Sequence, residues 1–366
     1  MNFKYHLLLL FLTFSLANCA QNGPIIDTDY EVIVPDLNIP WGFAFLPDNS
    51  VLVTEKEGKL IHYKNEKKTA ISGLPEIYVR GQGGLMDIKL HPNYKSNGWI
   101  YITYASPDGQ GDGGNTAVMR FKLKDNNLVD KQLLYKATPN STRGQHFGSR
   151  IAFDDKGYLF FSIGERGDRD TNPQDITRDC GKIYRLHDDG RIPSDNPFVN
   201  TPNAKKAIYS YGHRNPQGLI FNPNTKEIWD NEHGPQGGDE INIVEPGKNY
   251  GWPKISYGIN YNGTKFTDYT ALPGMEQPMH YWVPSIAPSG MAVITSDKYP
   301  GWKGNVLVGS LKFLYLANCY IKNGKVDKEE QLLKNLGRVR TVNEGPDGYI
   351  YVGIENLGIV KIIPKK

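Results

Sequence analysis

Three histidines lie in polar segments that separate the apolar runs of this sequence. His146, in GQHFGSR, stands among small polar residues immediately before an apolar run. The ordinary pKa of an imidazole lies close to neutral pH, so His146 could accept a proton from a substrate hydroxyl. His213 in YGHRN and His233 in NEHGP are rival bases, although we expect His213 to orient its neighbours. The sequence therefore predicts a general base at His146, with an ordinary loop histidine as the alternative.

Basic side chains occupy similar segments and form a second group of interest. Arg214, Lys312, Arg338 and Arg340 each occur near a short apolar run, with few acids close by in the sequence. A guanidinium group can bind a carboxylate through two parallel hydrogen bonds. Any one of these arginines alone would be read as an ion-pair residue, either on the surface or between neighbouring structural units. Together they indicate a site for a small polyanion.

The segment HGPQGGDE suggests a cation site. Gly234 and Pro235 leave backbone carbonyl oxygens accessible, and Asp239 and Glu240 add carboxylates. Oxygen ligands of this kind are what Ca²⁺ uses in proteins. The spacing is not that of an EF-hand, and the residue types alone do not exclude Mg²⁺ or an ordinary glycine-rich loop.

A repeated hairpin pattern predicts the elements that position these residues. Each copy has a short apolar run, a turn built from Pro, Asp, Asn and Gly, and a second apolar run, which is typical of a β-hairpin. Six copies predict an all-β fold, a six-bladed β-propeller with four strands in each blade; a pair of β-sandwiches would not explain them. We expect YEVIVPDL to complete the last blade beside GIVKIIP. The copies begin at Trp41, Gly84, Ser149, Gly218, Gly290 and Arg338.

The propeller geometry predicts where the chemically useful residues meet. Loops that enter the innermost strand of each blade lie close to the axis, so residues distant in sequence share one opening. On this basis we expect the following residues to converge: Gln82, His146, Arg214, Lys312, Arg338 and Arg340.

The two ends of the chain and its cysteines bear on where the protein works. Residues 1–19 read as a signal peptide, and their ending, LANC, resembles a bacterial lipobox with Cys19 as the lipidated residue. Plain secretion is the alternative. Residues 20–29 form a short linker, and residues 30–366 form a single propeller domain. We therefore expect an exported protein, periplasmic or anchored to the outer membrane. Cys180 and Cys319 could form a disulfide, but two buried free thiols are favoured.

Composition argues against some classes of partner. The 42 Lys and Arg against 39 Asp and Glu give a net charge of +3, and no run holds five or more like charges. This balance does not favour nucleic acid as a partner. A small-molecule substrate is the better expectation.

Four segments resemble a known family. PWGFAFLPDNSVLVTEKEGKL, GQGGLMDIKLHPNY, the run from GHRNPQG to NYGWP, and SIAPSGM are similar to the soluble PQQ-dependent aldose sugar dehydrogenases, within the glucose/sorbosone dehydrogenase family. The likeness extends from about residue 30 to residue 363. It also implies a six-bladed propeller, and it implies that the polyanion is pyrroloquinoline quinone (PQQ), a tricarboxylate.

The resemblance assigns ligands residue by residue. It implies Ca²⁺ on the carbonyls of Gly234 and Pro235, and a second, structural Ca²⁺ at Glu240 and Tyr250. Tyr261 and Trp282 would line the cofactor or sugar pocket. PQQ would be held by Gln82, Arg214, Asn215, Lys312, Arg338 and Arg340.

The resemblance also implies a reaction. His146 would take the proton of an aldose C1 hydroxyl while a hydride passes from C1 to PQQ, giving a lactone. Arg214 and Ca²⁺ would stabilise the charge that grows on the quinone oxygen. An external acceptor would then take the electrons. Two residues depart from the family pattern: Cys180 stands where a polar residue is expected, and Phe313 where a small residue is more usual.

Two other functions remain open at this point. One is a secreted six-bladed propeller that binds a partner without redox activity, which would have lost the basic residues. The other is a Ca²⁺-dependent lactonase or hydrolase propeller, which would need several acidic side chains at the axis. The basic residues are present and the axial loops read as basic, so the dehydrogenase is favoured.

Overall fold

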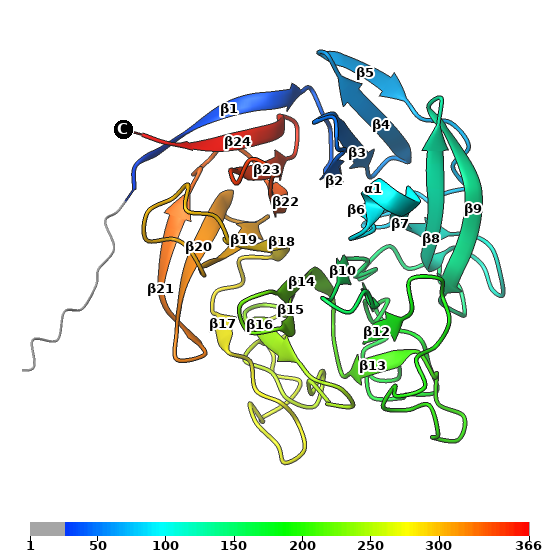
Figure 1. Ribbon diagram of the computed structural model, residues 1–366. Coiled ribbons are helices and arrows are strands. Elements are labelled where there is room, and N and C mark those ends of the chain that lie inside the picture. Colours follow the sequence, from blue (N-terminus) through cyan, green and yellow to red (C-terminus); the bar gives the residue numbers. More distant parts are fainter. Residues whose placement is uncertain (1–25, 366) are drawn as a thin grey trace, which may run out of the picture.

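Six antiparallel sheets of four strands each surround a single axis in the computed structural model, which describes residues 26–365 (Figure 1). The predicted all-β, six-bladed propeller is thus confirmed. In five blades the first strand in chain order is the innermost, whereas the sixth has its earliest strand at the outer edge. The inner strands contact one another around the ring. Within the described residues the only α-helix is a single turn, α1 (Tyr94–Asn97).

The strands of the first three blades follow one another directly along the chain. Blade 1 contains β2 (Pro40–Phe45), β3 (Val51–Glu55), β4 (Lys59–Lys64) and β5 (Lys67–Ala70). Blade 2 contains β6 (Leu85–Leu90), β7 (Ile100–Ser106), β8 (Asn115–Lys124) and β9 (Asn127–Lys136). Blade 3 contains β10 (Ile151–Phe153), β11 (Leu159–Ile163), β12 (Lys182–Leu186) and β13 (Ile208–Tyr211).

The remaining blades include the strand that closes the ring. Blade 4 contains β14 (Pro216–Asn222), β15 (Glu227–Glu232), β16 (Asp239–Val244) and β17 (His280–Trp282). Blade 5 contains β18 (Pro288–Val293), β19 (Val306–Ser310), β20 (Tyr315–Lys322) and β21 (Lys325–Leu332). Blade 6 contains β22 (Val339–Glu344), β23 (Ile350–Ile354), β24 (Gly358–Pro364) and, from the other end of the chain, β1 (Thr28–Pro35).

The six hairpins predicted from the sequence are the two inner strands of the six blades. They are β2–β3, β6–β7, β10–β11, β14–β15, β18–β19 and β22–β23. The turn residues act as expected. Asn49 and Gly348 both adopt positive φ, at 64° and 78°, between the strands of their hairpins.

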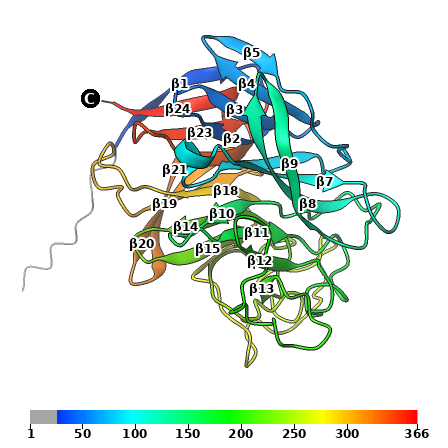
Figure 2. The same cartoon turned by 45° about the vertical axis from the view of Figure 1, so that its right-hand side comes forward.

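The ring is closed by pairing the two ends of the described chain. β1 runs antiparallel to β24, with Val32 opposite Val360, and both strands remain side by side in the two views of Figures 1 and 2. This is the pairing that YEVIVPDL and GIVKIIP predicted. It covers the edge of β24 that would otherwise be open.

Apolar side chains fill the space between every pair of neighbouring blades. The cluster between blades 5 and 6, for example, includes Trp302, Leu316 and Val352, all fully buried. Similar clusters lie between the other neighbours. Because a lone blade could not bury its apolar faces, the ring holds its loops at the axis in fixed positions.

Some sequence predictions concern regions outside the site. The signal peptide, Cys19 and most of the linker lie outside the described residues. Among the residues that are described, no helix is both long enough and apolar enough to span a membrane. Cys180 and Cys319 are buried free thiols in separate blades, which is the favoured alternative.

Candidate active site

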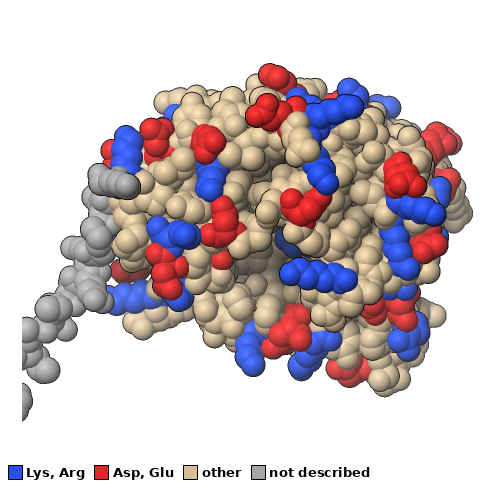
Figure 3. Space-filling model, turned by 45° about the horizontal axis from the view of Figure 1, so that its top comes forward, with Lys and Arg blue, Asp and Glu red and all other residues tan. Residues whose placement is uncertain are grey.

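A cavity of about 230 Å³ lies where loops from five blades meet. Three of the residues expected to converge, Gln82, Arg338 and Arg340, line it. The face in Figure 3 is hollowed near its centre, and Lys and Arg alternate with Asp and Glu over that face. The cavity is lined by Ile39, Trp41, Lys56, Gly81, Gln82, Met86, Phe147, Gly148, Gln217, Arg338, Arg340 and Glu355.

Gln82 joins the loops of blades 2, 3 and 4. Its Oε1 accepts hydrogen bonds from the backbone N–H of His146 (2.9 Å) and from Nδ2 of Asn215 (3.4 Å). Asn215 Oδ1 in turn accepts the N–H of Gly148 (3.1 Å). The preceding Gly81 has φ 57°, and a Cβ there would clash with the carbonyl of Gly144. The structure therefore brings Gln82, His146 and Asn215 together at the cavity.

His146 lies directly before the cavity-lining Phe147, in an unusual backbone conformation. Its φ is 56°, a left-handed value that is uncommon for a residue other than glycine. The side chain is 14% exposed, and its Nδ1 is hydrogen-bonded to Glu165, which is buried. The carboxylate therefore fixes Nδ1 as the protonated nitrogen and leaves Nε2 as the nitrogen that can accept a proton.

The electrostatic surroundings keep His146 neutral. Burial and the positive charge of Arg214 lower the pKa of His146 below its usual 6.5, against the opposing effect of Glu165. A neutral imidazole at pH 7 has the protonation state that a general base needs.

The two rival histidines are engaged elsewhere. His233 donates from Nε2 to the carbonyl of Pro288 (2.6 Å), and burial lowers its pKa to about 3. His213 is fully buried, with Nδ1 at 3.0 Å from Glu232 Oε1 and Nε2 at 2.8 Å from Ser210 Oγ. Of the three, His146 is the one directly next to cavity-lining residues in the sequence, and its Nε2 has no hydrogen bond to any described residue.

In four blades, a glutamate stands at or just after the end of the second strand. Each of these glutamates contacts the segment that leads into the first strand of its own blade. Sequence reasoning missed them, although four copies of the hairpin repeat carry a glutamate there. Their contacts are Glu55 with Asn38 N–H, Glu165 with His146, Glu232 with the N–H groups of Arg214 and Asn215, and Glu355 with Arg338 and Arg340.

Glu355 corrects the expectation that few acids lie near the basic residues. Its carboxylate accepts from Arg338 Nε (2.9 Å) and Arg340 Nε (3.0 Å). Arg340 is buried and also donates to Gln217 Oε1 (3.1 Å), whereas the side chain of Arg338 is 47% exposed. The two guanidinium groups and one carboxylate leave one positive charge in excess, so the cavity still suits an anion.

Arg214 and Lys312 lie near the cavity without lining it. Arg214 Nη1 donates to the carbonyl of His233 (3.1 Å), and its charge lowers the pKa of His146. Lys312 follows Leu311, whose carbonyl accepts from Arg338 Nη1 (3.1 Å). The ammonium of Lys312 lies 5.0 Å from the centre of the Phe313 ring.

The structure does not bring Tyr261 and Trp282 to the cavity. Tyr261 is 75% exposed, in the long segment between β16 and β17. Trp282 is buried against blade 5, and its Nε1 donates to Glu329 Oε2 (2.7 Å). It borders a separate groove that it shares with Phe313 and Tyr315.

The HGPQGGDE turn is held in place by Asp239. The Asp239 carboxylate accepts from Gly234 N–H (2.8 Å), Ala287 N–H (2.8 Å) and Ser285 Oγ (2.7 Å). A Cβ at Gly234 would clash with the carbonyls of Gly237 and Gly238. Asp239 therefore supports the turn, and the suggestion that it adds a ligand beside the Gly234 and Pro235 carbonyls does not fit its contacts.

Glu240 faces the other side of β16, where a buried acidic cluster lies. Glu240 stands opposite Glu232 in the strand register, and Asn242 stands opposite Asp230. Burial and the charge of Glu232 raise the pKa of both Asp230 and Glu240.

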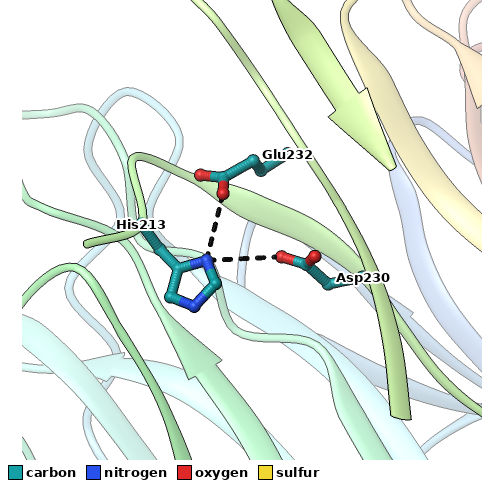
Figure 4. Close-up of side chains that lie close together, drawn as sticks. All are labelled: His213, Asp230 and Glu232. Atoms are coloured by element: carbon teal, nitrogen blue, oxygen red, sulfur yellow. Dashed lines mark hydrogen bonds and ion pairs between the residues drawn. The ribbon is translucent and has the colours of Figure 1, made fainter. Parts of the chain in front are cut away.

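His213 completes this cluster (Figure 4). Its Nδ1 lies 3.0 Å from Glu232 and 3.6 Å from Asp230. Both carboxylate oxygens of Asp230 and Oδ1 of Asn242 are buried without a hydrogen bond to any described residue. The hydroxyl of Tyr250, whose ring stacks on His213, donates to Ile243 O (2.5 Å). Buried, unsatisfied oxygens of this kind form a donor set for a hard cation.

Comparisons with known proteins extend over the whole ring. The sequence profile of the family described as Glucose / Sorbosone dehydrogenase matches residues 37–360. The aldose sugar dehydrogenase YliI of Escherichia coli is 43% identical over 330 residues, which are 88% of each chain. Quinoprotein glucose dehydrogenase B of Acinetobacter calcoaceticus is 30% identical over 319 residues, 78% of this chain and 64% of the relative.

A solved structure agrees with these matches. The PQQ-bound form of the aldose sugar dehydrogenase from Streptomyces coelicolor is similar with a TM-score of 0.75 and 27% identity. The similarity covers 94% of this chain and 100% of that chain. The profile match begins before β2 and ends within β24, so it includes the inner hairpin of every blade and omits the closing strand β1.

Proposed function

Because this chain belongs to the glucose/sorbosone dehydrogenase family, we propose that it is a quinoprotein that oxidises aldose sugars at C1 to lactones, with PQQ in the axial cavity. The observation that carries this proposal is the arrangement of the cavity. Paired arginines line it, and a neutral histidine held by a buried glutamate directly precedes the lining residue Phe147.

The residues present fit the chemistry of PQQ. Arg338 and Arg340 offer guanidinium groups to carboxylates, and Lys312 follows Leu311, whose carbonyl Arg338 binds. Gln82 and Asn215 offer amide groups from two further blades. When bound, PQQ supplies the redox chemistry, because a quinone can accept two electrons and a proton as a hydride.

The chain's own residues would supply the acid–base chemistry. His146 Nε2 would take the proton of the C1 hydroxyl. The hydrogen of the C1–H bond would leave with its electron pair as a hydride, for which bound PQQ would be the acceptor. The sugar thus loses two electrons and two hydrogens and becomes the lactone. Glu165 holds Nδ1–H and stabilises the imidazolium that forms. Arg214 places a positive charge near His146, where it could stabilise the charge that grows on the quinone oxygen.

The oxygen donors suggest two Ca²⁺ positions. The carbonyls of Gly234 and Pro235 would hold the ion that touches the cofactor. Glu240 and Tyr250 would hold the structural ion, and we propose that Asp230 and Glu232 share it, because their carboxylates lie in the same buried cluster. An ion there would offset the repulsion among the carboxylates of Asp230, Glu232 and Glu240, of which the first two are buried.

Removing Ca²⁺ should lower the melting temperature and the activity of the PQQ-loaded protein. A ligand that binds only the folded state stabilises it, so chelation removes that stabilisation. Ca²⁺ should restore both better than Mg²⁺, which requires a tighter octahedral site. The measurement is thermal unfolding after exhaustive chelation and metal add-back. An unchanged melting temperature and full activity would exclude both sites.

Arg338→Ala should weaken PQQ binding by at least about tenfold, or about 1.4 kcal/mol. The substitution removes a guanidinium group that would bind one carboxylate of PQQ. Arg338 is half-exposed, and Arg340 remains to neutralise Glu355 in the variant. Titration of the apoprotein with PQQ measures the change. Arg191→Ala, at a surface arginine that pairs with Asp189, is the matched control and should bind PQQ as the parent does. Equal affinity of the Arg338 variant and the parent would remove Arg338 from the clamp.

The surroundings of the reaction also follow from the proposal. Reduced cofactor must pass its electrons to an external acceptor, and the leader over residues 1–19 suggests export to the periplasm, with a lipid on Cys19 as an anchor. Mass spectrometry of the mature N-terminus would test the anchor, because a lipidated Cys19 and a simple cleavage product differ in mass.

A further inference from the structure

The interior of the ring contains a buried ion pair that the proposed reaction does not use. Arg150, immediately before β10, and Asp87, on β6, are 5% and 4% exposed. Arg150 Nη1 lies 3.1 Å from Asp87 Oδ1, and Asp87 Oδ2 accepts the N–H of Ile151 (2.9 Å). We call Arg150 and Asp87 the axial pin.

The guanidinium of the axial pin binds the backbone of three other blades. Nε donates to the carbonyl of Gln217 in blade 4 (2.8 Å), and Nη1 to that of Trp41 in blade 1 (3.3 Å). Nη2 donates to the carbonyl of Arg340 in blade 6 (3.3 Å). The guanidinium carbon also lies 4.1 Å from the centre of the Trp41 ring, which adds a cation–π contact.

These three acceptors are themselves walls of the axial cavity. Trp41, Gln217 and Arg340 all line it, and Arg340 Nη1 also donates to Gln217 Oε1 (3.1 Å). A fork of fixed geometry that binds the backbone of three lining residues limits their movement relative to one another. An ordinary ion pair between neighbouring blades would not need to reach three blades and the cavity lining at once.

We propose that Arg150, oriented by Asp87, is a positioning residue that presets the cofactor cavity by fixing Trp41, Gln217 and Arg340. The functional part of this inference rests on the proposed binding of PQQ in that cavity. Residues that are already fixed in the free protein lose less conformational entropy when the ligand binds, so the affinity of the cavity for PQQ is higher.

Arg120 offers a matched control. It is also buried, lies over a tryptophan (4.2 Å from Trp99), and pairs with Asp188 (3.2 Å), but it does not line or touch the cavity. Arg150→Gln and Arg120→Gln should both lower the melting temperature, because each removes the positive charge that pairs with a carboxylate and lies over a tryptophan ring. Only Arg150→Gln should raise the Kd for PQQ, by about tenfold or more.

Arg150→Lys serves if the glutamine variant does not fold. Lysine keeps the charge beside Asp87 but lacks the planar fork, so its melting temperature should stay closer to that of the parent while its Kd for PQQ still rises. Amide hydrogen exchange in the apoprotein gives a readout that needs no cofactor. Exchange should accelerate in segments 36–46, 214–222 and 336–344 of the Arg150 variants and not in Arg120→Gln.

The outcomes separate the two proposals. Failure of the parent protein to bind PQQ would overturn the proposed function. The amide exchange pattern alone would then decide whether Arg150 fixes the three segments. Folded Arg150 variants with parental affinity for PQQ and parental amide exchange in these three segments would contradict the positioning role of Arg150.

Discussion

Replacing His146 with alanine should lower turnover by about two to four orders of magnitude while PQQ still binds. The expected loss is the value of a positioned base, because Nε2 of His146 is the proton acceptor in the proposed reaction. Cofactor binding should persist, since His146 meets Gln82 through its backbone N–H rather than its side chain. The measurement is kcat with saturating PQQ, an aldose and a dye acceptor.

Asparagine is the sharper substitution at this position. His146 has φ 56°, a conformation that asparagine tolerates better than alanine. His146→Asn should therefore keep the loop in place and still lack a proton acceptor, so its turnover should be as low as that of His146→Ala. His62→Asn is the control, because His62 contacts Ser50 and Asn126 and lies outside the cavity lining.

The pH dependence gives the same claim a second test. Burial and Arg214 lower the pKa of His146, so kcat/KM should rise with pH through a value below 6.5 and flatten in both variants. The stability effect has the matching sign. The unfolded chain binds a proton at His146 more readily than the folded one, so the free energy of unfolding falls as pH drops through 6.5.

A His146 variant with more than about half the parental kcat would make His146 a structural residue.

Glu165→Gln should lower kcat by about ten- to a hundredfold with a smaller change in KM. The substitution keeps the shape of the side chain but removes the charge that stabilises the imidazolium and fixes its tautomer. Because Glu165 raises the pKa of His146, its loss should also move the acid limb of the pH profile to lower pH. Steady-state kinetics between pH 4 and pH 8 would measure both effects (roughly the range that spans the imidazole pKa).

Glu55→Gln is the matched control for Glu165→Gln. Glu55 ends the second strand of blade 1 and accepts the N–H of Asn38, so it holds a loop without touching His146. It should leave the acid limb where it is in the parent. If Glu165→Gln behaved like Glu55→Gln in both kcat and pH profile, Glu165 would support the loop and nothing more.

The sequence was sufficient to predict the ring of blades. Each hairpin carries its own turn residues, and its two apolar runs need partners on both faces, so six copies lead directly to a propeller. The closing pair, β1 with β24, followed from the same argument, because an unpaired edge at one end of the ring needs a strand from the other end.

The contacts between loops could not be read in the same way. The pairing of Glu165 with His146 and of Glu355 with two arginines depends on where loops return to their own blade, and the turn sequences do not specify that path. Trp282 was expected at the cofactor or sugar pocket. In the structure its ring packs between blades, because β17 faces the apolar cluster shared with blade 5.

The alternation of side chains along a strand could have separated Asp239 from Glu240 in the sequence. They were grouped as acids of one glycine-rich turn, but they begin the strand β16. Successive side chains of a strand point to opposite faces, so two adjacent acids cannot serve one site. Asp239 accordingly supports the HGPQGGDE turn, and Glu240 joins the buried acidic cluster with Glu232.

The central claim is that this propeller uses PQQ to oxidise aldoses at C1. The most direct test adds PQQ and Ca²⁺ to the purified apoprotein and follows dye reduction and lactone formation over a panel of aldoses. The claim predicts that both products appear together, that they require PQQ, and that sugars blocked at C1 are inert. Tight PQQ binding without oxidation of any aldose, or lactone formation without PQQ, would contradict it.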